Sequence, residues 1–350
     1  MFKRVLVAAA VAGAFAAPAF AEVAISGSAE MDFFYRTNNT PNGDGKLLEE
    51  VAIVINLDGS DKLDTGDTLK WRLAQKVATD YRYDSFGKRE AWIGYAGSWG
   101  ELRFGNQFTN TYLQMDWPYG VKGSGNLWAD LGAYSVNWGD AVSYFSPNWG
   151  GFSFAAQYKL GSQDDATNTN GYDISGGYGN DVFNIDGGYQ VHNDQLVGTF
   201  AVGGNGQVTG DLVAADAKTE LGHIGGRVRF GAFNIRAAYK ANKWEKGSDD
   251  VKLNQYLIGG GYGFGKNNIT LSYQHLDGAE LNGNSVGSDI DQLAFQWDYS
   301  LSKNTGAFLQ ARYQKFDDAS KSKLPSWAID GWNGKDDNVS RILVGTWTGF

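Results

Sequence analysis

The sequence predicts an all-β fold, a 16-stranded antiparallel transmembrane β-barrel. Two observations support this prediction. Apolar and polar residues alternate with period two over segments of about ten residues, and short turns alternate along the chain with long polar connections. After Ala21 the chain has no run of about 18 apolar residues, so we expect no helical membrane span. A barrel closed by its own hydrogen-bond ladder needs no disulfide, and the chain has no cysteine.

The beginning of the chain has the layout of a cleavable export signal. Lys3 and Arg4 precede an apolar run, and Ala19, Phe20 and Ala21 form a small-x-small cleavage site. We therefore expect a signal peptide over residues 1–21 and a single barrel domain over residues 22–350. The alternative, a membrane anchor, is disfavoured because the apolar run is too short to cross a bilayer as a helix.

Composition and charge narrow the class of protein. Aromatic residues make up 14% of the chain, with 12 Trp and 18 Tyr, which suits the two aromatic girdles of a membrane barrel. The net charge is −9, and without Lys3 and Arg4 the chain has 28 basic against 39 acidic side chains, a net charge of −11. This balance argues against nucleic acid as a partner, because phosphate binding needs an excess of Lys and Arg. We expect no cofactor.

The alternation is clearest in the second half of the chain, where strands are predicted near residues 256–264, 269–273, 293–299 and 309–314. Short turns are predicted near residues 231–232, 265–266 and 302–303. Long polar connections are predicted near residues 243–252, 277–289 and 317–337. Short turns at one end and long loops at the other are typical of an outer-membrane barrel.

The number of strands follows from a parity argument. Seventeen extended segments can be counted, but both chain ends should lie in the periplasm, which requires an even number. We therefore assign residues 196–202 to a long outer loop over about 193–218, where they can form a hairpin. The sixteen strands that remain enclose an aqueous channel, because a barrel of this size is too wide for side chains to fill.

Three stretches of the sequence carry a family resemblance. Residues 89–107 read REAWIGYAGSWGELRFGNQ, residues 140–158 read DAVSYFSPNWGGFSFAAQY, and the chain closes on VGTWTGF. With the start AISGSAEMDFFYR, they resemble the trimeric general-diffusion porins of Gram-negative outer membranes, especially the betaproteobacterial type. The resemblance implies a non-enzymatic, water-filled channel for passive diffusion of small hydrophilic solutes and ions.

The same resemblance implies partners. The chain would form a homotrimer, with the second loop over about residues 80–85 as a latch between subunits. The barrel-assembly machinery would read the last strand, which alternates to a terminal Phe350. Lipid and lipopolysaccharide of the outer membrane would surround the barrel.

The segment over residues 108–139 is too long for a simple connection between strands. By resemblance it is the third loop, which folds into the barrel, and its acids Asp116 and Asp130 would face the lumen. Alternation places six arginines on the inner wall opposite, because a charge turned to the lipid would cost about 2–4 kcal/mol near the midplane. These wall residues are Arg72, Arg103, Arg227, Arg229, Arg236 and Arg312.

Acids on the loop and bases on the wall would form a charged constriction that acts on passing ions. Asn106 and Ser143 stand where the family pattern often has Arg. We therefore expect mild selectivity, and the sequence leaves its sign open.

Two other functions remain open. A substrate-specific channel for sugars or anions could use an aromatic slide built from Trp117, Trp128 and Trp138. A barrel enzyme is the second alternative, but the three histidines, His192, His223 and His275, accompany no G-x-S-x-G motif. The paired aspartates of the loops match no calcium-binding spacing, so we expect no metal site, although binding of divalent cations by loop acids stays open.

Overall fold

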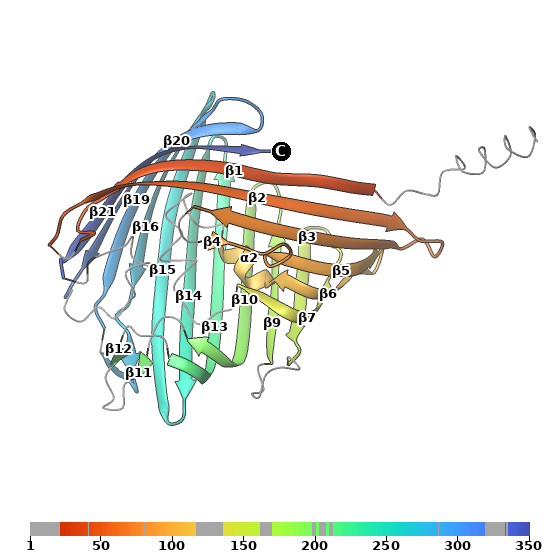
Figure 1. Cartoon of the computed structure of the whole chain (residues 1–350), viewed down its shortest axis with the longest axis horizontal. Coiled ribbons are helices and arrows are strands. Elements are labelled where there is room, and N and C mark those ends of the chain that lie inside the picture. The colour runs from red at the N-terminus through yellow and green to blue at the C-terminus, as the bar shows by residue number, and fades with distance from the viewer. Residues whose placement is uncertain are drawn as a thin grey trace, which may run out of the picture.

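The computed structural model describes residues 22–40, 42–79, 82–116, 136–161, 170–197, 201–202, 208–209, 213–285, 287–318, 333 and 335–350. The expected signal peptide, residues 1–21, lies outside the described residues. The described residues form an all-β closed barrel of 16 long antiparallel strands (Figure 1), as the alternation predicted.

The barrel strands follow one another in chain order around the wall. They are β1 (Glu22–Arg36), β2 (Lys46–Lys62), β3 (Thr68–Ala78), β5 (Glu90–Gly97), β6 (Gly100–Phe108), β7 (Asn137–Phe145), β8 (Phe152–Lys159), β9 (Gly171–Gly179), β10 (Phe183–Val197), β13 (Val213–Phe230), β14 (Phe233–Lys246), β15 (Asp249–Phe264), β16 (Asn267–Leu276), β19 (Ile290–Ser300), β20 (Thr305–Phe316) and β21 (Asn338–Gly349).

The remaining elements are short. They are β4 (Arg82–Tyr83), β11 (Ala201–Val202), β12 (Val208–Thr209), β17 (Glu280–Leu281), β18 (Asn284–Ser285) and the helix α2 (Asn110–Asp116). No helix among the described residues is long and apolar enough to cross a membrane.

The first and last strands close the barrel. β1 pairs antiparallel with β21, with Ser28 opposite Gly349 and Arg36 opposite Arg341. Because every other pair is also antiparallel, closure requires an even number of strands and brings both ends of the sheet to the same rim. Figure 1 shows β1 and β21 side by side at this seam.

The connections confirm most of the predicted turns. Hairpin turns at residues 231–232 and 265–266 join β13 to β14 and β15 to β16. The predicted connection over residues 243–252 is wrong, because β14 and β15 continue until a turn at Gly247, which has a φ of 61°. Charged residues made this stretch look like a loop, whereas Lys246 and Asp249 in fact face each other across the two strands.

The loop near residues 193–218 is shorter than predicted. β10 and β13 pair as far as Val197 opposite Val213. Residues 201–202 and 208–209 form the small β11–β12 hairpin instead of a barrel strand. The assignment that led to sixteen strands is therefore confirmed, while the boundaries of the loop lie several residues closer to its tip.

The two faces of the wall differ as the alternation predicted. Outward side chains are apolar and exposed, for example Ile224, Val228 and Ile235, which are 54%, 47% and 50% exposed. Inward positions on the same strands hold Arg227, Arg236 and other polar groups. Cross-strand stacks such as Phe233 on Tyr262, with ring centroids 4.4 Å apart, add an aromatic girdle near the short turns.

Candidate functional site: the lumen of the barrel

The helix α2 follows β6 and lies inside the barrel, where Figure 1 shows it crossing the inner face of the wall. The Asn110 Nδ2 donates to Ser175 Oγ at 2.7 Å. The Gln114 Nε2 donates to the carbonyl of Gly176 at 3.2 Å. The beginning of the predicted third loop therefore folds inward. Asp116 ends α2, but its side chain lies outside the described part, as does the whole of Asp130.

Apolar contacts complete the docking of α2. Met115 is fully buried and packs against Leu221, Ala238 and Leu257 of β13, β14 and β15. These three residues alternate inward on neighbouring strands, so they form one apolar patch inside an otherwise polar lumen. Burying a Met side chain contributes about 1.5–3 kcal/mol, enough to hold a two-turn helix against the wall.

A glycine makes the close approach of α2 possible. A Cβ at Gly188 would stand 2.5 Å from Thr111 Oγ1 and 2.9 Å from His223 Cε1. Such distances are too short for any side chain, so only glycine allows the helix to lie here. His223 is itself fully buried, with Nε2 3.6 Å from Asp186 Oδ1, which fits a structural role for this histidine.

Two positions where the family pattern often has Arg tie down the base of the third loop. Ser143 is buried and accepts a hydrogen bond from Gln157 Nε2 at 2.9 Å. The same Nε2 donates to the carbonyl of Phe108, at the end of β6, at 3.1 Å. Asn106 donates to the carbonyls of Gly87 and Lys88 at 3.1 and 2.9 Å. Both side chains are therefore held by hydrogen bonds within the wall and its connections.

Arg72 and Arg103 face the lumen, each beside carboxylates. Arg72 Nε lies 2.6 Å from Asp58 Oδ1, and its Nη1 lies 3.2 Å from Glu90 Oε2. Arg103 Nε lies 2.5 Å from Glu101 Oε1. Asp58 and Glu90 come from the two strands that flank β3, whereas Glu101 lies two residues before Arg103 on β6. All three carboxylates face inward, so this sector of the wall carries nearly balanced charge.

Trp92 connects the two arginines. It lies opposite Arg72 in the β3–β5 register, and the guanidinium carbon of Arg103 stands 4.2 Å from its ring centroid. Arg103 also lies 4.5 Å from the ring centroid of Phe145. Stacking between these two rings fixes the guanidinium of Arg103 in place. The alternation of apolar and polar residues did not predict this stacking.

Arg227, Arg229 and Arg236 form a second group, on β13 and β14. Arg227 lies directly opposite Arg236 in the register, and Arg229 is exposed. Arg227 Nε donates to Asn184 Oδ1 at 3.1 Å, and Arg236 Nη2 donates to Asn234 Oδ1 at 2.8 Å, so both of these acceptors are uncharged amides. Three like charges on adjacent inward positions make this the most basic sector among the described residues.

Arg312 belongs to a third sector, at the seam. It is 2% exposed and lies opposite Arg341 of β21, which lies opposite Arg36 of β1. The sequence predicted only Arg312 here. The alternation of the last strand also predicts an inward Arg341, because its neighbours Ile342 and Val344 are apolar, and the structure places them outward, 57% and 51% exposed. The inward acids of β1 and β2, Glu30, Asp32 and Glu50, were also missed.

All six predicted arginines therefore lie on the inner face, but in three separate sectors rather than as one cluster. Arg72 and Arg103 are brought together, as are Arg227, Arg229 and Arg236, while Arg312 stands apart with Arg341. Trp138, named for an aromatic slide, is 1% exposed and packs on the His192 ring at 6.0 Å. Trp117 and Trp128 lie outside the described residues.

Comparison with known proteins decides the family. A profile described as Gram-negative porin matches residues 8–319, most of the chain. The chain belongs to the Gram-negative porin family. It is thus a non-enzymatic channel protein of the outer membrane, as the resemblance of its strand motifs implied.

Two curated relatives illustrate the range of the family. The chitoporin of Vibrio furnissii is 24% identical over 309 residues, 78% of this chain and 82% of the relative. An outer membrane porin protein of Bordetella pertussis is 26% identical over 378 residues, 89% of this chain and 94% of the relative.

Two solved structures share the fold. The anion-selective porin from Comamonas acidovorans gives a TM-score of 0.71 at 18% identity, covering 95% of this chain and all of that one. The trimer form of OmpT from Vibrio cholerae gives a TM-score of 0.70 at 14% identity, covering 94% and 99%. At these identities the likeness concerns the fold of the barrel.

Proposed function

We propose that this porin is a general-diffusion channel whose constriction lies between the third loop and the inner wall. The observation that carries the proposal is the docking of α2 inside the barrel, by Met115, Asn110 and Gln114. A loop held against the wall narrows the lumen at a fixed place. Small hydrophilic solutes and ions would pass through the water that remains.

The wall charges support weak selectivity. Arg72 and Arg103, which would attract anions, are each within ion-pair distance of a carboxylate. The sector of Arg227, Arg229 and Arg236 is basic, whereas Glu30, Asp32 and Glu50 make the inner face of β1 and β2 acidic. Asp116 and Asp130 on the third loop would add to the acidic side, so bases and acids would face each other across the pore.

Planar-bilayer recordings in a KCl gradient test this balance. We expect a reversal potential close to zero, because compensated rings act weakly on passing ions. The small residual potential should shrink further as the ionic strength rises, since salt screens exposed charges. A reversal potential near the limit for an ideally anion- or cation-selective pore would overturn the proposal.

A substrate-specific sugar channel is the second candidate, and the likeness to a chitoporin favours it. The aromatic slide expected of such a channel would need exposed rings, whereas Trp138 is buried here. Current block distinguishes the two. A general-diffusion channel should show only weak, rapid block by chitooligosaccharides and by maltooligosaccharides alike, whereas long blocks by one series alone would identify a specific channel.

The trimer form of OmpT and the exposed side chains of the second loop support a homotrimer in which this loop is the latch between subunits. Tyr83 and Phe86 project from this loop and are 69% and 54% exposed. The loop is held to the barrel by Gln75 Nε2, which donates to the Asp84 carbonyl at 2.7 Å. A double substitution Y83S/F86S should therefore convert trimers to monomers in native electrophoresis, with barrel circular dichroism unchanged. Trimers that persist in this variant would contradict the role of the second loop as a latch.

Recognition of the last strand by the barrel-assembly machinery is the third part of the proposal. The Phe350 ring is 57% exposed, and its backbone pairs with Gly27 through two hydrogen bonds of 2.9 and 3.1 Å. The ring therefore stays on the outer surface, where another protein can read it. Phe350→Ala should lower the yield of assembled barrel in cells much more than it lowers refolding in detergent. Equal losses would point to a purely structural role.

Lipopolysaccharide is the expected lipid neighbour at the outer rim. Lys218 and Lys243 lie on the outward face there, each within ion-pair distance of Glu220 or Glu245. Cationic side chains at this height suit the phosphates of lipopolysaccharide. K218E/K243E should weaken co-purification of lipopolysaccharide, and unchanged co-purification would remove these two lysines from the interaction.

A further inference from the structure

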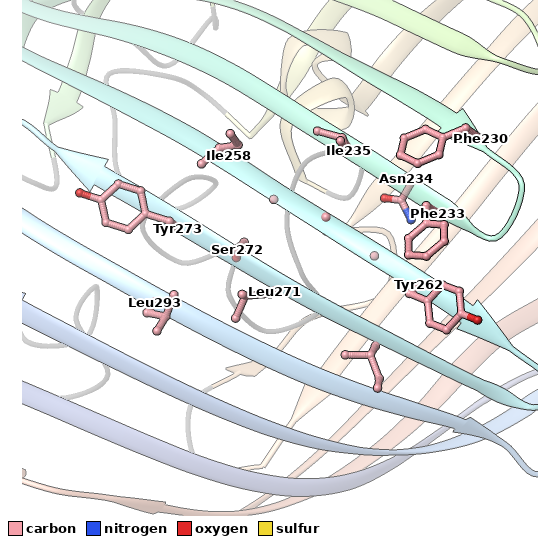
Figure 2. A pocket seen from close by; sticks show the side chains of 14 residues that line it. Phe230, Phe233, Asn234, Ile235, Ile258, Tyr262, Leu271, Ser272, Tyr273 and Leu293 are labelled. Carbon is pink, nitrogen blue, oxygen red and sulfur yellow. The ribbon is translucent and has the colours of Figure 1, made fainter.

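A hollow of about 490 Å³ opens on the outer wall of the barrel. Most of its lining side chains are outward residues of β14, β15, β16 and β19, so it faces the membrane and not the lumen. Figure 2 shows its middle as a bare strip of β15 between two groups of side chains. No part of the channel described above uses this hollow.

The floor of the hollow is Gly260. On its two sides lie Ile235 of β14 and Leu271 of β16, its partners in the register. A Cβ at Gly260 would meet only one atom within 4 Å, the Asn234 carbonyl oxygen at 3.3 Å. The neighbouring strands therefore do not force a glycine here. Glycine inside a strand weakens it, and it often marks a place where a ligand approaches the backbone closely.

One end of the hollow is an aromatic rim. Phe230 stacks on Phe233 at 5.8 Å, Phe233 on Tyr262 at 4.4 Å, and Tyr262 on Phe264 at 5.5 Å between ring centroids. These rings lie next to the short turns, at the height of the periplasmic girdle. From there the hollow runs along the strands towards Ile258, as Figure 2 shows. This direction leads away from the short turns and therefore deeper into the membrane.

A cation stands beside the aromatic rim. Lys266 is exposed in the turn directly after Phe264. At the height of this turn the headgroups of the periplasmic leaflet carry phosphates. The hollow is apolar and begins beneath aromatic rings and a lysine. A phospholipid has the matching arrangement, with its acyl chain in the membrane and its phosphate at the surface.

We propose that the hollow seats one acyl chain of a phospholipid of the periplasmic leaflet, with the phosphate at Lys266. The chain would lie over Gly260, between Ile235 and Leu271. Size favours a lipid over a second copy of the protein. Fourteen residues line the hollow, whereas a stable protein interface uses about 20–30 residues on each side.

Photo-crosslinking in nanodiscs tests the proposal. The probe is phosphatidylglycerol with a diazirine on its acyl chain, and the labelled residues are mapped by peptide mass spectrometry. We expect labelling per residue to peak in β15 and β16 around Gly260, several-fold above equally exposed outward positions such as Ile174 and Ile185, which are 57% and 48% exposed. Even labelling of all outward strands would overturn the proposal.

Two matched variants sharpen the test. Gly260→Leu fills the floor and should remove the labelling peak. Gly226→Leu is the control, because Gly226 is also an outward strand glycine whose Cβ would stand 3.3 Å from a backbone oxygen, that of Asn184. Leu271→Phe fills the hollow from its side and replaces Gly260→Leu if that variant fails to fold. A peak that persists in the filled barrel would contradict the site.

Lys266→Glu separates the headgroup from the chain. It should lower labelling by phosphatidylglycerol more than labelling by phosphatidylcholine carrying the same chain. If the unchanged protein and Lys266→Glu were each labelled equally by the two lipids, Lys266 would have no role in binding the headgroup. If Gly260→Leu instead changed the oligomeric mass, the hollow would be an interface between copies, and the proposal of a lipid site would fail.

Discussion

Thr111 of α2 lies directly over Gly188 of β10, in space that a side chain at Gly188 would need. The helix that begins the third loop is thus held at a position defined by the absence of one Cβ. In the proposed channel this loop narrows the lumen, so the width of the pore would depend on this contact.

Substitution at Gly188 should therefore narrow the channel. A valine there must increase the 2.5 Å separation from Thr111 Oγ1 to about 3.5–4 Å, which moves α2 by about 1 Å towards the lumen. We expect Gly188→Val to lower single-channel conductance and to raise current noise. Gly222→Val is the control, since a Cβ at Gly222 has no neighbour closer than 3.8 Å. Equal conductance in the two variants would contradict the role of this contact.

Neutralising a wall arginine should change ion preference. Arg72→Gln leaves Asp58 and Glu90 without their counter-charge, so cation permeability should rise relative to anion permeability by about twofold, or about 0.4 kcal/mol. Glu90→Gln should shift the ratio in the opposite direction. The measurement is the reversal potential in a KCl gradient. Shifts of the same sign in both variants would contradict the compensation of the Arg72 charge by the neighbouring carboxylates.

The two faces of a strand predict opposite tolerance of charge. Ile55 is outward and 39% exposed, whereas Asn56 is inward and donates to Ser26 Oγ at 3.4 Å. Ile55→Arg should destabilise the barrel by about 2–4 kcal/mol if it lies near the midplane, and Asn56→Arg by much less, because water in the lumen hydrates the charge. Urea titration of the refolded proteins in lipid vesicles measures both, and equal losses would invalidate the register.

The second loop should loosen in acid. The hydrogen bond from Arg82 holds the pKa of Asp84 below its usual value of 3.8. A depressed pKa means that this pair stabilises the loop fully above the usual value and loses that contribution as the pH falls through the lowered pKa. Proteolysis of the loop should therefore accelerate below about pH 4, and the acceleration should be absent from Arg82→Gln, in which the loop is already loosened at neutral pH. A pH profile shared by both proteins would contradict this account.

The sequence predicted the barrel well because lipid imposes a strict rule on each strand. Alternation placed Arg72, Arg227 and Arg312 on the inner face, since the opposite register would turn charges to lipid. It failed at residues 243–252, where β14 and β15 continue as a charged hairpin without a long loop. Period-two patterning reports burial in the membrane, and it does not report where a strand ends in water.

Contacts between side chains on different strands could not be predicted from the sequence, for another reason. The partners of Arg72 are Asp58 and Glu90, on two different neighbouring strands. Predicting these partners requires the register of each hairpin. Alternation shows which residues face inward, and this leaves registers that differ by two residues equally possible. The docking of Thr111 on Gly188 joins segments 77 positions apart and depends on the tilt of the strands in the closed barrel.

Liposome swelling with a graded set of neutral sugars and amino acids tests the central claim most directly. A general-diffusion pore narrowed by the third loop should give rates that fall smoothly with solute size, with no solute favoured beyond its size, and Gly188→Val should shift the whole curve towards smaller solutes. One solute that enters far faster than others of equal size, in both proteins, would contradict general diffusion.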